Sequence, residues 1–144
     1  MEKFTYKITE DDIELRGAFQ VRQQVFTGEQ SIAEDLVFDG NDDEAVHLIV
    51  KDKESVIGTA RVRFTGQNQA KLERMAVLSS FRGQGIGRGI ISFLTTDLNK
   101  KQFRKLIIHA QYEVIGFYEA CGFRQVGIPF WEAGIKHVQM ELKL

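Results

Sequence analysis

The spacing of hydrophobic residues predicts an amphipathic helix over residues 84–99. Apolar side chains recur there every four positions, as one buried helix face requires, at Ile86, Ile90, Leu94 and Leu98. Apolar runs on either side predict a central strand over Lys71–Leu78 and a buried strand over Lys105–Ala110. A strand, a helix and a strand in this order predict a βαβ unit, in which the two strands are normally parallel.

The pattern elsewhere predicts further strands and helices. Thr9-Glu10-Asp11-Asp12 offers an N-cap and an acidic first turn to a helix that follows a short strand near Phe4–Ile8. The other expected elements are strands at Val46–Lys51, Val56–Phe64, Phe123–Ile128 and Ile135–Leu142, and a short helix over Val114–Cys121. We expect the first two of these strands to form a hairpin around Asp52–Ser55, and the last two to form a terminal antiparallel pair.

The strand Val56–Phe64 shows a regular alternation of polar and apolar residues. Apolar side chains at Ala60, Val62 and Phe64 alternate with polar ones at Thr59, Arg61 and Arg63. Because successive side chains of a strand point to opposite faces, this pattern predicts a half-exposed strand.

Composition limits the class of protein. The length of 144 residues fits a single domain, and we take residues 1–144 as that domain. The net charge of −1 argues against attraction to nucleic acid or to an anionic membrane. Since no apolar run approaches the roughly 20 residues of a membrane span and the N-terminus does not resemble a targeting peptide, we expect a cytoplasmic protein. The lone Cys121 and three scattered histidines have no zinc-site spacing, so we expect no metal.

A glycine-rich turn precedes the helix. Between Phe81 and Gly89, four glycines occupy alternate positions at Gly83, Gly85, Gly87 and Gly89. At a helix N-terminus the first N–H groups lack helical partners and the helix dipole is positive, so main chain alone can hold a pyrophosphate. Arg82 and Arg88 would add positive charge. The segment has neither the Gly-Lys-Ser/Thr of a P-loop nor the G-x-G-x-x-G of a dinucleotide site.

The motif Arg82-x-x-Gly85-x-Gly87 resembles the coenzyme A pyrophosphate loop of the GNAT superfamily of N-acetyltransferases. Two further segments are similar to that family: Met75-Ala76-Val77 and Phe117-Tyr118-x-x-Cys121-Gly122-Phe123. Residues 23–30, Gln111 and Gly127-Ile128-Pro129 resemble more narrowly its ElaA-like or YjcF-like branch. The resemblance covers nearly the whole chain.

The resemblance implies a fold, a co-substrate and a reaction. It implies a single-domain α/β fold with a mixed, mostly antiparallel sheet flanked by helices, in which two splayed parallel strands hold coenzyme A. It implies acetyl transfer from acetyl-CoA to a primary amine of a small molecule or peptide, by direct attack in a ternary complex. The positions expected to contact the coenzyme are Met75, Ala76, Val77, Arg82, Gly83, Gln84, Gly85, Ile86, Gly87, Arg88 and Gln111. Gln111 replaces the Asn usual in the family, and its amide can still hydrogen-bond the pantetheine arm.

Two residues are candidates for the chemistry. The resemblance places the Tyr118 hydroxyl near the coenzyme sulfur as a general acid, although Tyr118 also suits a partly buried packing position. Glu73 alternates in phase with Met75 and Val77, so we expect it on their face of the strand, where its carboxylate could relay a proton through water. The alternative for Glu73 is an ion pair with an arginine at 61, 63 or 74. A backbone N–H of residues 75–77 is the candidate for polarising the thioester carbonyl.

The acceptor is constrained only by charge. Residues 24–50 contain no Lys or Arg but seven carboxylates, at Glu29, Glu34, Asp35, Asp39, Asp42, Asp43 and Glu44. A carboxylate-lined entrance would attract a cationic amine, whereas a solvated acidic loop would have no such role. A non-catalytic acetyl-CoA-binding sensor and a nucleotide-binding regulatory domain are the alternative functions. The sequence leaves open whether the chain forms a homodimer.

Overall fold

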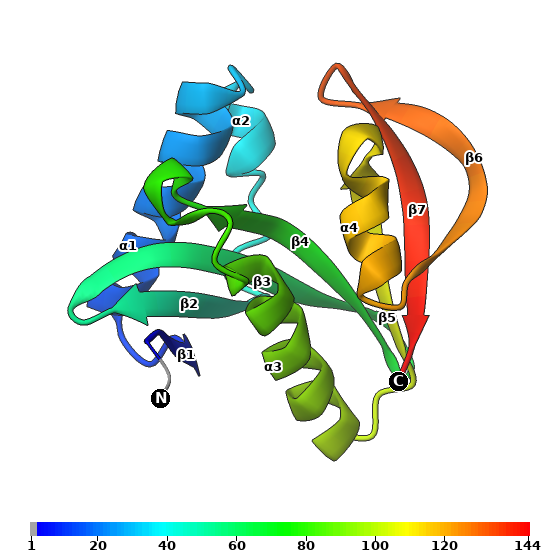
Figure 1. Ribbon diagram of the computed structural model, residues 1–144, viewed down its shortest axis with the longest axis horizontal. Coiled ribbons are helices and arrows are strands. Elements are labelled where there is room, and N and C mark those ends of the chain that lie inside the picture. The colour runs from blue at the N-terminus through cyan, green and yellow to red at the C-terminus, as the bar shows by residue number, and fades with distance from the viewer. Residues whose placement is uncertain (1–2) are drawn as a thin grey trace.

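Seven strands form one sheet in the order β1-β2-β3-β4-β5-β7-β6 in the computed structural model, which describes residues 3–144 (Figure 1). Neighbouring strands are antiparallel except for the parallel pair β4 and β5. The strands are β1 (Thr5–Ile8), β2 (Val46–Asp52), β3 (Ser55–Gly66), β4 (Gln69–Val77), β5 (Lys105–Gln111), β6 (Arg124–Glu132) and β7 (Ile135–Lys143). The predicted mixed, mostly antiparallel sheet with one parallel step is confirmed.

The three predicted helices begin close to the predicted positions, whereas a short helix at Glu34–Val37 and a π-helix at Gln23–Glu29 were not predicted. Asp11 caps the first helix, because its Oδ1 accepts a hydrogen bond of 2.8 Å from the backbone N–H of Glu14. The helices are α1 (Asp12–Arg22), α2 (Glu34–Val37), α3 (Ile86–Lys100) and α4 (Ile115–Ala120), with a π-helix η1 (Gln23–Glu29) and 3-10 turns η2 (Ser79–Phe81) and η3 (Tyr112–Val114). The π-helix continues α1 directly and ends beside the sheet.

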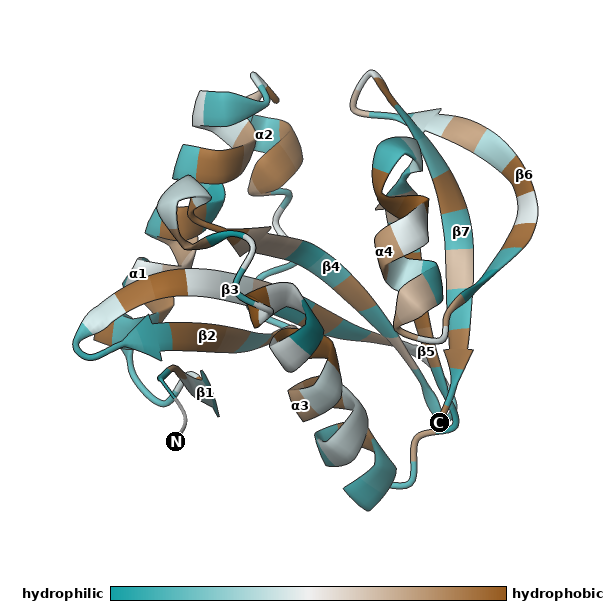
Figure 2. Ribbon diagram, viewed as in Figure 1, coloured by the Kyte–Doolittle hydropathy of each residue, from teal (hydrophilic) through white to brown (hydrophobic). Residues whose placement is uncertain are grey.

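Helices cover both faces of the sheet. On one face the buried stripe of α3 and Ile115 of α4 pack in one core with Leu72, Leu106 and Ile108. On the other face Val21 and Val25, from α1 and η1, pack on Ala76 of β4. Hydrophobic and hydrophilic residues alternate over residues 69–73 of β4 and 137–143 of β7, because successive side chains of a strand point to opposite faces (Figure 2). We call these the α3 face and the α1 face.

The polar side of β3 is buried, which differs from the predicted half-exposed strand. Arg61 is 0% exposed, whereas the apolar Phe64 near the strand end is 45% exposed. The physical reason is charge pairing, because Arg61 contacts the carboxylates of Asp39, Asp42 and Glu73. A buried guanidinium is tolerated when counterions and hydrogen bonds replace water.

A β-bulge interrupts β4 at Arg74. The register with β3 passes from Arg61 opposite Glu73 to Thr59 opposite Ala76, and Arg74 has a left-handed φ of 53°. The additional residue changes the phase of the alternation. Glu73 therefore shares the α1 face with Arg61, while Met75 packs against the core of the α3 face. The prediction that Glu73 lies on the face of Met75 and Val77 is wrong, because it assumed unbroken alternation.

Candidate active site

The parallel strands β4 and β5 diverge halfway along their length. They pair only from Gln69 opposite Lys105 to Leu72 opposite Ile108, and beyond this point the two halves of the sheet splay apart (Figure 1). The splay opens a cavity of about 700 Å³, a size typical of small-molecule sites. Its walls include residues 71–77 of β4, His109 and Gln111 of β5, and Phe117 and Tyr118 of α4. The predicted splay of two parallel strands is thus present.

The start of α3 has the geometry expected of an anion site. Gly83 and Gly85 both have φ of +80°, and Gly85 is the N-cap without any side-chain cap. The helical hydrogen bonds begin with Gly89 N–H donating to Gly85 C=O at 2.9 Å. The N–H groups of residues 86–88 precede that bond, so they are the unpaired donors of this helix end.

Gly87 has a second role in packing. A Cβ at this position would lie 3.0 Å from the Phe117 ring, so the missing side chain lets α3 approach α4 closely. The alternate glycines therefore serve different purposes: the left-handed pair shapes the turn, and Gly87 brings the helix start next to the cavity wall.

The two arginines of the motif differ in their contacts. Arg82 Nε donates to the Val77 carbonyl at 2.9 Å, and its Nη2 lies 2.9 Å from Glu29 Oε2, which joins the end of β4 to η1. Arg88 is exposed on α3 and has no hydrogen bond or ion pair with residues 3–144. Arg88 could therefore bind a phosphate without giving up a contact within the protein, whereas Arg82 would have to give up its own. Contact of either arginine with the coenzyme stays a prediction.

Tyr118 lies in the cavity wall among aromatic rings. Its ring centroid lies 5.0 Å from Phe117 and 5.7 Å from Phe123, both in edge-to-face geometry. Burial raises the pKa of Tyr118, with a smaller effect from nearby Cys121, so the hydroxyl keeps its proton well above neutral pH. Tyr118 thus lines the cavity and keeps its proton, as a proton donor must, although packing alone would also place the ring there.

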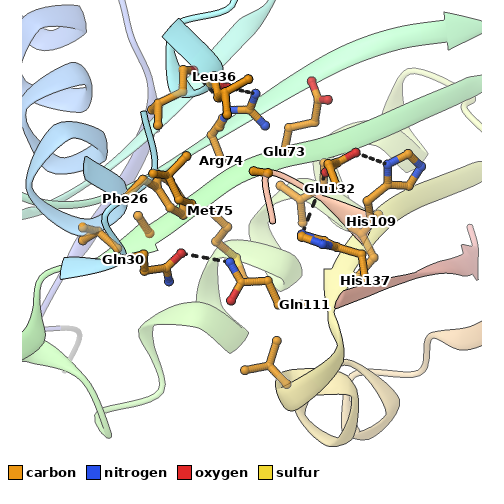
Figure 3. Close-up of a pocket in the computed structure, with 18 of the residues that line it drawn as sticks. Phe26, Gln30, Leu36, Glu73, Arg74, Met75, His109, Gln111, Glu132 and His137 are labelled. Atoms are coloured by element: carbon orange, nitrogen blue, oxygen red, sulfur yellow. Dashed lines mark hydrogen bonds and ion pairs between the residues drawn. The ribbon is translucent and has the colours of Figure 1, made fainter. Parts of the chain in front are cut away.

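Gln111 bridges the cavity mouth. Its Nε2 donates a hydrogen bond of 2.9 Å to Oε1 of Gln30, at the end of η1 (Figure 3). The side chain therefore lies at the splay, where the resemblance expects the pantetheine arm. Contact with the coenzyme would exchange this amide pair for a new partner.

Glu73 is held by three cations. Its Oε1 lies 2.6 Å from Arg63 Nε and 2.9 Å from Arg61 Nη2, and its Oε2 lies 3.2 Å from Lys71 Nζ. Burial by itself would raise the pKa of Glu73, but the Arg63 hydrogen bond and the charges of Arg61 and Lys71 lower it to about 2. Protonating such a carboxylate at pH 7 costs about 7 kcal/mol. This geometry favours the ion-pair alternative over the proton relay.

The acidic segment is partly neutralised inside the protein. Asp42 lies 2.8 Å from the buried Arg22, and Asp39 lies 2.8 Å from Arg61 and 3.1 Å from Arg74. With Glu29 paired to Arg82, three of the seven carboxylates are counterions of arginines. The expectation of a cationic acceptor therefore depends on the remaining four, of which Asp35 lines the cavity.

Three side chains that the sequence pattern did not predict to be neighbours lie close together on the cavity wall. His109 Nδ1 lies 3.2 Å from Glu132 Oε1, and His137 Nε2 lies 3.8 Å from Glu132 Oε2 (Figure 3). They come from β5, β6 and β7 and become neighbours because β7 inserts between β5 and β6. Strand alternation could have identified His109, because it lies two residues before the predicted site residue Gln111 and therefore on the same face of the strand.

Two features are absent from residues 3–144. In that part of the chain, no group of three or more His, Cys, Asp or Glu is arranged to hold a metal ion. No helix there combines the length and apolar character needed to cross a bilayer.

Comparison with known proteins identifies the family. The model of the acetyltransferase (GNAT) domain matches residues 7–144. The chain belongs to the GNAT acetyltransferase family. The uncharacterised N-acetyltransferase YjcF of Bacillus subtilis is 34% identical over 134 residues, which cover 92% of this chain and 95% of YjcF. The resemblance to the GNAT superfamily is therefore confirmed.

Solved GNAT structures share the fold. A candidate N-acetyltransferase from Lactobacillus plantarum superposes with a TM-score of 0.93 at 25% identity and covers 99% of both chains. Escherichia coli ElaA superposes with a TM-score of 0.85 at 21% identity, over 96% of this chain and 99% of ElaA. GNAT enzymes take acetyl groups from acetyl-CoA, so the splayed strands and the start of α3 are the expected place for this co-substrate.

Proposed function

We propose that this chain transfers acetyl from acetyl-CoA to a primary amine of a small molecule or peptide, by direct attack of the amine in a ternary complex. The observation that carries the proposal is the cavity between β4 and β5. One side of this cavity carries Tyr118 and lies next to the start of α3, whereas the opposite side is polar and titratable. A thioester reaching in from α3 and an amine entering from the polar side would meet between the strands.

The chain offers groups for binding and for chemistry. The turn at residues 83–88 would hold the pyrophosphate through its N–H groups, with Arg88 supplying charge. Beyond Leu72 the backbone of β4 has no pairing with β5, so N–H groups of residues 75–77 are candidates for polarising the thioester carbonyl. In the reaction the amine nitrogen bonds to the acetyl carbon and the carbon–sulfur bond breaks. The amine loses one proton, and Tyr118 would donate one to the leaving thiolate.

Two measurements test this function. Acetyl-CoA is titrated into the protein by calorimetry, with ATP and NAD as competitors. Thiol release from acetyl-CoA is then followed across polyamines, amino sugars, amino acids and peptides, and products are weighed by mass spectrometry. We expect tight acetyl-CoA binding, amine-dependent thiol release and a product heavier by one acetyl group. Binding without amine-dependent release from any class would instead favour a sensor module, and displacement by ATP or NAD would favour a nucleotide-binding domain.

A further inference from the structure

The cluster of His109, Glu132 and His137 lies on the α1 face of the splayed strands. Leu106, Ile108 and Ala110 of β5 point into the core under α3, so the alternate residues His109 and Gln111 point to the other face. His137 of β7 lies directly opposite Gln111 in the antiparallel register, which places both side chains on one face. In Figure 3, His137 lies between Gln111 and Glu132. The cluster thus faces the cavity from the side opposite α3 and α4.

The hydrogen bond of His137 fixes which ring nitrogen is free. Its Nδ1 lies 2.7 Å from the carbonyl oxygen of Ile135, and because a carbonyl only accepts, Nδ1 carries a hydrogen. In the neutral ring, Nε2 is then an acceptor. The side chain is 8% exposed, Nε2 forms no hydrogen bond with residues 3–144, and Glu132 Oε2 lies 3.8 Å from it, beyond hydrogen-bonding distance. Two acceptors therefore lie side by side at the cavity wall without a donor between them.

Glu132 is prepared to stabilise a cation at this point. Its Oε1 accepts from His109 Nδ1, which leaves Oε2 directed toward His137. That hydrogen bond is the main reason why the pKa of Glu132 is lowered, so the carboxylate is ionised near neutrality. A carboxylate oxygen 3.8 Å from Nε2 would stabilise the positive charge that forms when this ring takes a proton from a substrate.

We propose that His137 is the general base that removes a proton from the attacking amine, with Glu132 stabilising the imidazolium and His109 holding Glu132 in place. An N–H bond of the incoming ammonium group breaks and Nε2 of His137 gains that proton, so the lone pair left on the neutral amine can attack the thioester carbon. The second proton leaves the nitrogen as the carbon–sulfur bond breaks, and it balances the proton that Tyr118 gives to the thiolate. The proposal rests on the proposed function. It puts the proton acceptor and the donor Tyr118 on opposite walls of the cavity, so each proton moves on its own side of the reacting carbon.

The other charged groups around the cluster do not compete for this role. Arg63 of β3 and Lys71 of β4 both pair with the carboxylate of Glu73, which also pairs with Arg61. Tyr118 on α4 retains its proton. His109 uses Nδ1 to donate to Glu132, which makes it a positioning residue.

The test compares the pH dependence of His137→Gln with that of the wild type, using the best primary amine found by thiol release. We expect kcat/KM at pH 7 to fall about 10²–10⁴-fold, because the general base is lost. The deficit should shrink as pH approaches the pKa of the amine itself, since an amine already neutral needs no base. An aniline acceptor, neutral at pH 7, should show a small deficit. Acetyl-CoA affinity should be unchanged, and exposed Lys136→Gln on the same strand is the matched control.

Glu132→Gln provides a second variant at a half-exposed position. Removing the negative charge destabilises the imidazolium, so the acidic limb of the kcat/KM profile should move to lower pH. A group with only a packing role would lower the rate without moving this limb. Circular dichroism verifies that each variant is folded.

The results separate two kinds of failure. If the wild type binds acetyl-CoA but acetylates no amine, the proposed function fails and the role of His137 falls with it. If the wild type is active and folded His137→Gln keeps its rate and pH profile, only the base assignment is overturned. A loss of kcat/KM in His137→Gln that is the same at all pH values and with anilines also overturns the base assignment, because that result indicates that His137 has only a packing role.

Discussion

Replacing Glu73 with Gln should cost stability more than catalysis. The pKa of this carboxyl is lowered from 4.5 to about 2 by Arg63, Arg61 and Lys71, which more than offset the opposing effect of burial. At about 1.4 kcal/mol per pKa unit, the ionised form stabilises the folded state by about 3 kcal/mol. The side chain is 7% exposed, so solvent screens these ion pairs little. Glu73→Gln should therefore lower the free energy of unfolding at pH 7 by about 3 kcal/mol.

The pH dependence has a definite sign. Because the folded pKa is lowered, this stabilisation is present above the unfolded value of about 4.5 and is lost as pH falls through about 2. The stability of the wild type should thus fall between pH 5 and pH 2, and that of Glu73→Gln should fall less across the same window. The difference between the two proteins should shrink as the medium is acidified.

Urea denaturation at a series of pH values, followed by circular dichroism, measures both effects. Glu54→Gln is the control, because Glu54 is 99% exposed and its ion pair at 3.9 Å is worth little. Amine-dependent thiol release is measured on the same samples. Unchanged stability together with a large loss of kcat and of the acidic limb of the profile would refute this reasoning and make Glu73 the catalytic base.

Three further predictions concern the coenzyme and the acceptor. Gly85→Ala should cost about 1–2 kcal/mol of stability because φ is +80°, and should weaken acetyl-CoA binding in calorimetry; unchanged affinity would remove the turn from the coenzyme site. Tyr118→Phe should lower kcat about 10²–10⁴-fold while acetyl-CoA affinity persists, and full turnover would make it a packing residue. If the acceptor is cationic, its kcat/KM should fall with added salt, and Asp43→Asn with Glu44→Gln should flatten that dependence; salt-insensitive kinetics would indicate a merely solvated loop.

Local pattern was enough to predict most elements of the fold. Helix α3, its glycine turn and both parallel strands follow from periodicity and from the conformations that glycine allows, which are properties of neighbouring residues. The same reasoning failed at Arg74, because a bulge depends on pairing with β3 and leaves no distinct local sign. The exposure of Arg61 was wrongly predicted for a related reason. An arginine in an alternating strand is expected on the exposed face unless its counterions, which here come from another segment, are known.

The candidate site was predicted only on its coenzyme side. Motifs within one segment identified the turn and Tyr118, and the resemblance supplied their roles. The polar side of the cavity was not predicted, because His109, Glu132 and His137 become neighbours only through the strand order β5-β7-β6. Strand order is a non-local property, and a terminal antiparallel pair is compatible with either of its strands next to β5.

The bulge at Arg74 divides β4 into two half-strands that can vary independently. The half before it, with Glu73, belongs to the charged layer under α1, and the half after it presents Met75 to the opposite layer. Mutations that remodel the charged layer therefore leave the backbone at residues 75–77 in place. Deleting Arg74 would remove that independence, because Met75 would then fall opposite Ala60 and β4 would pair with β3 without interruption. A single additional residue thus gives this strand two separate routes of evolutionary change.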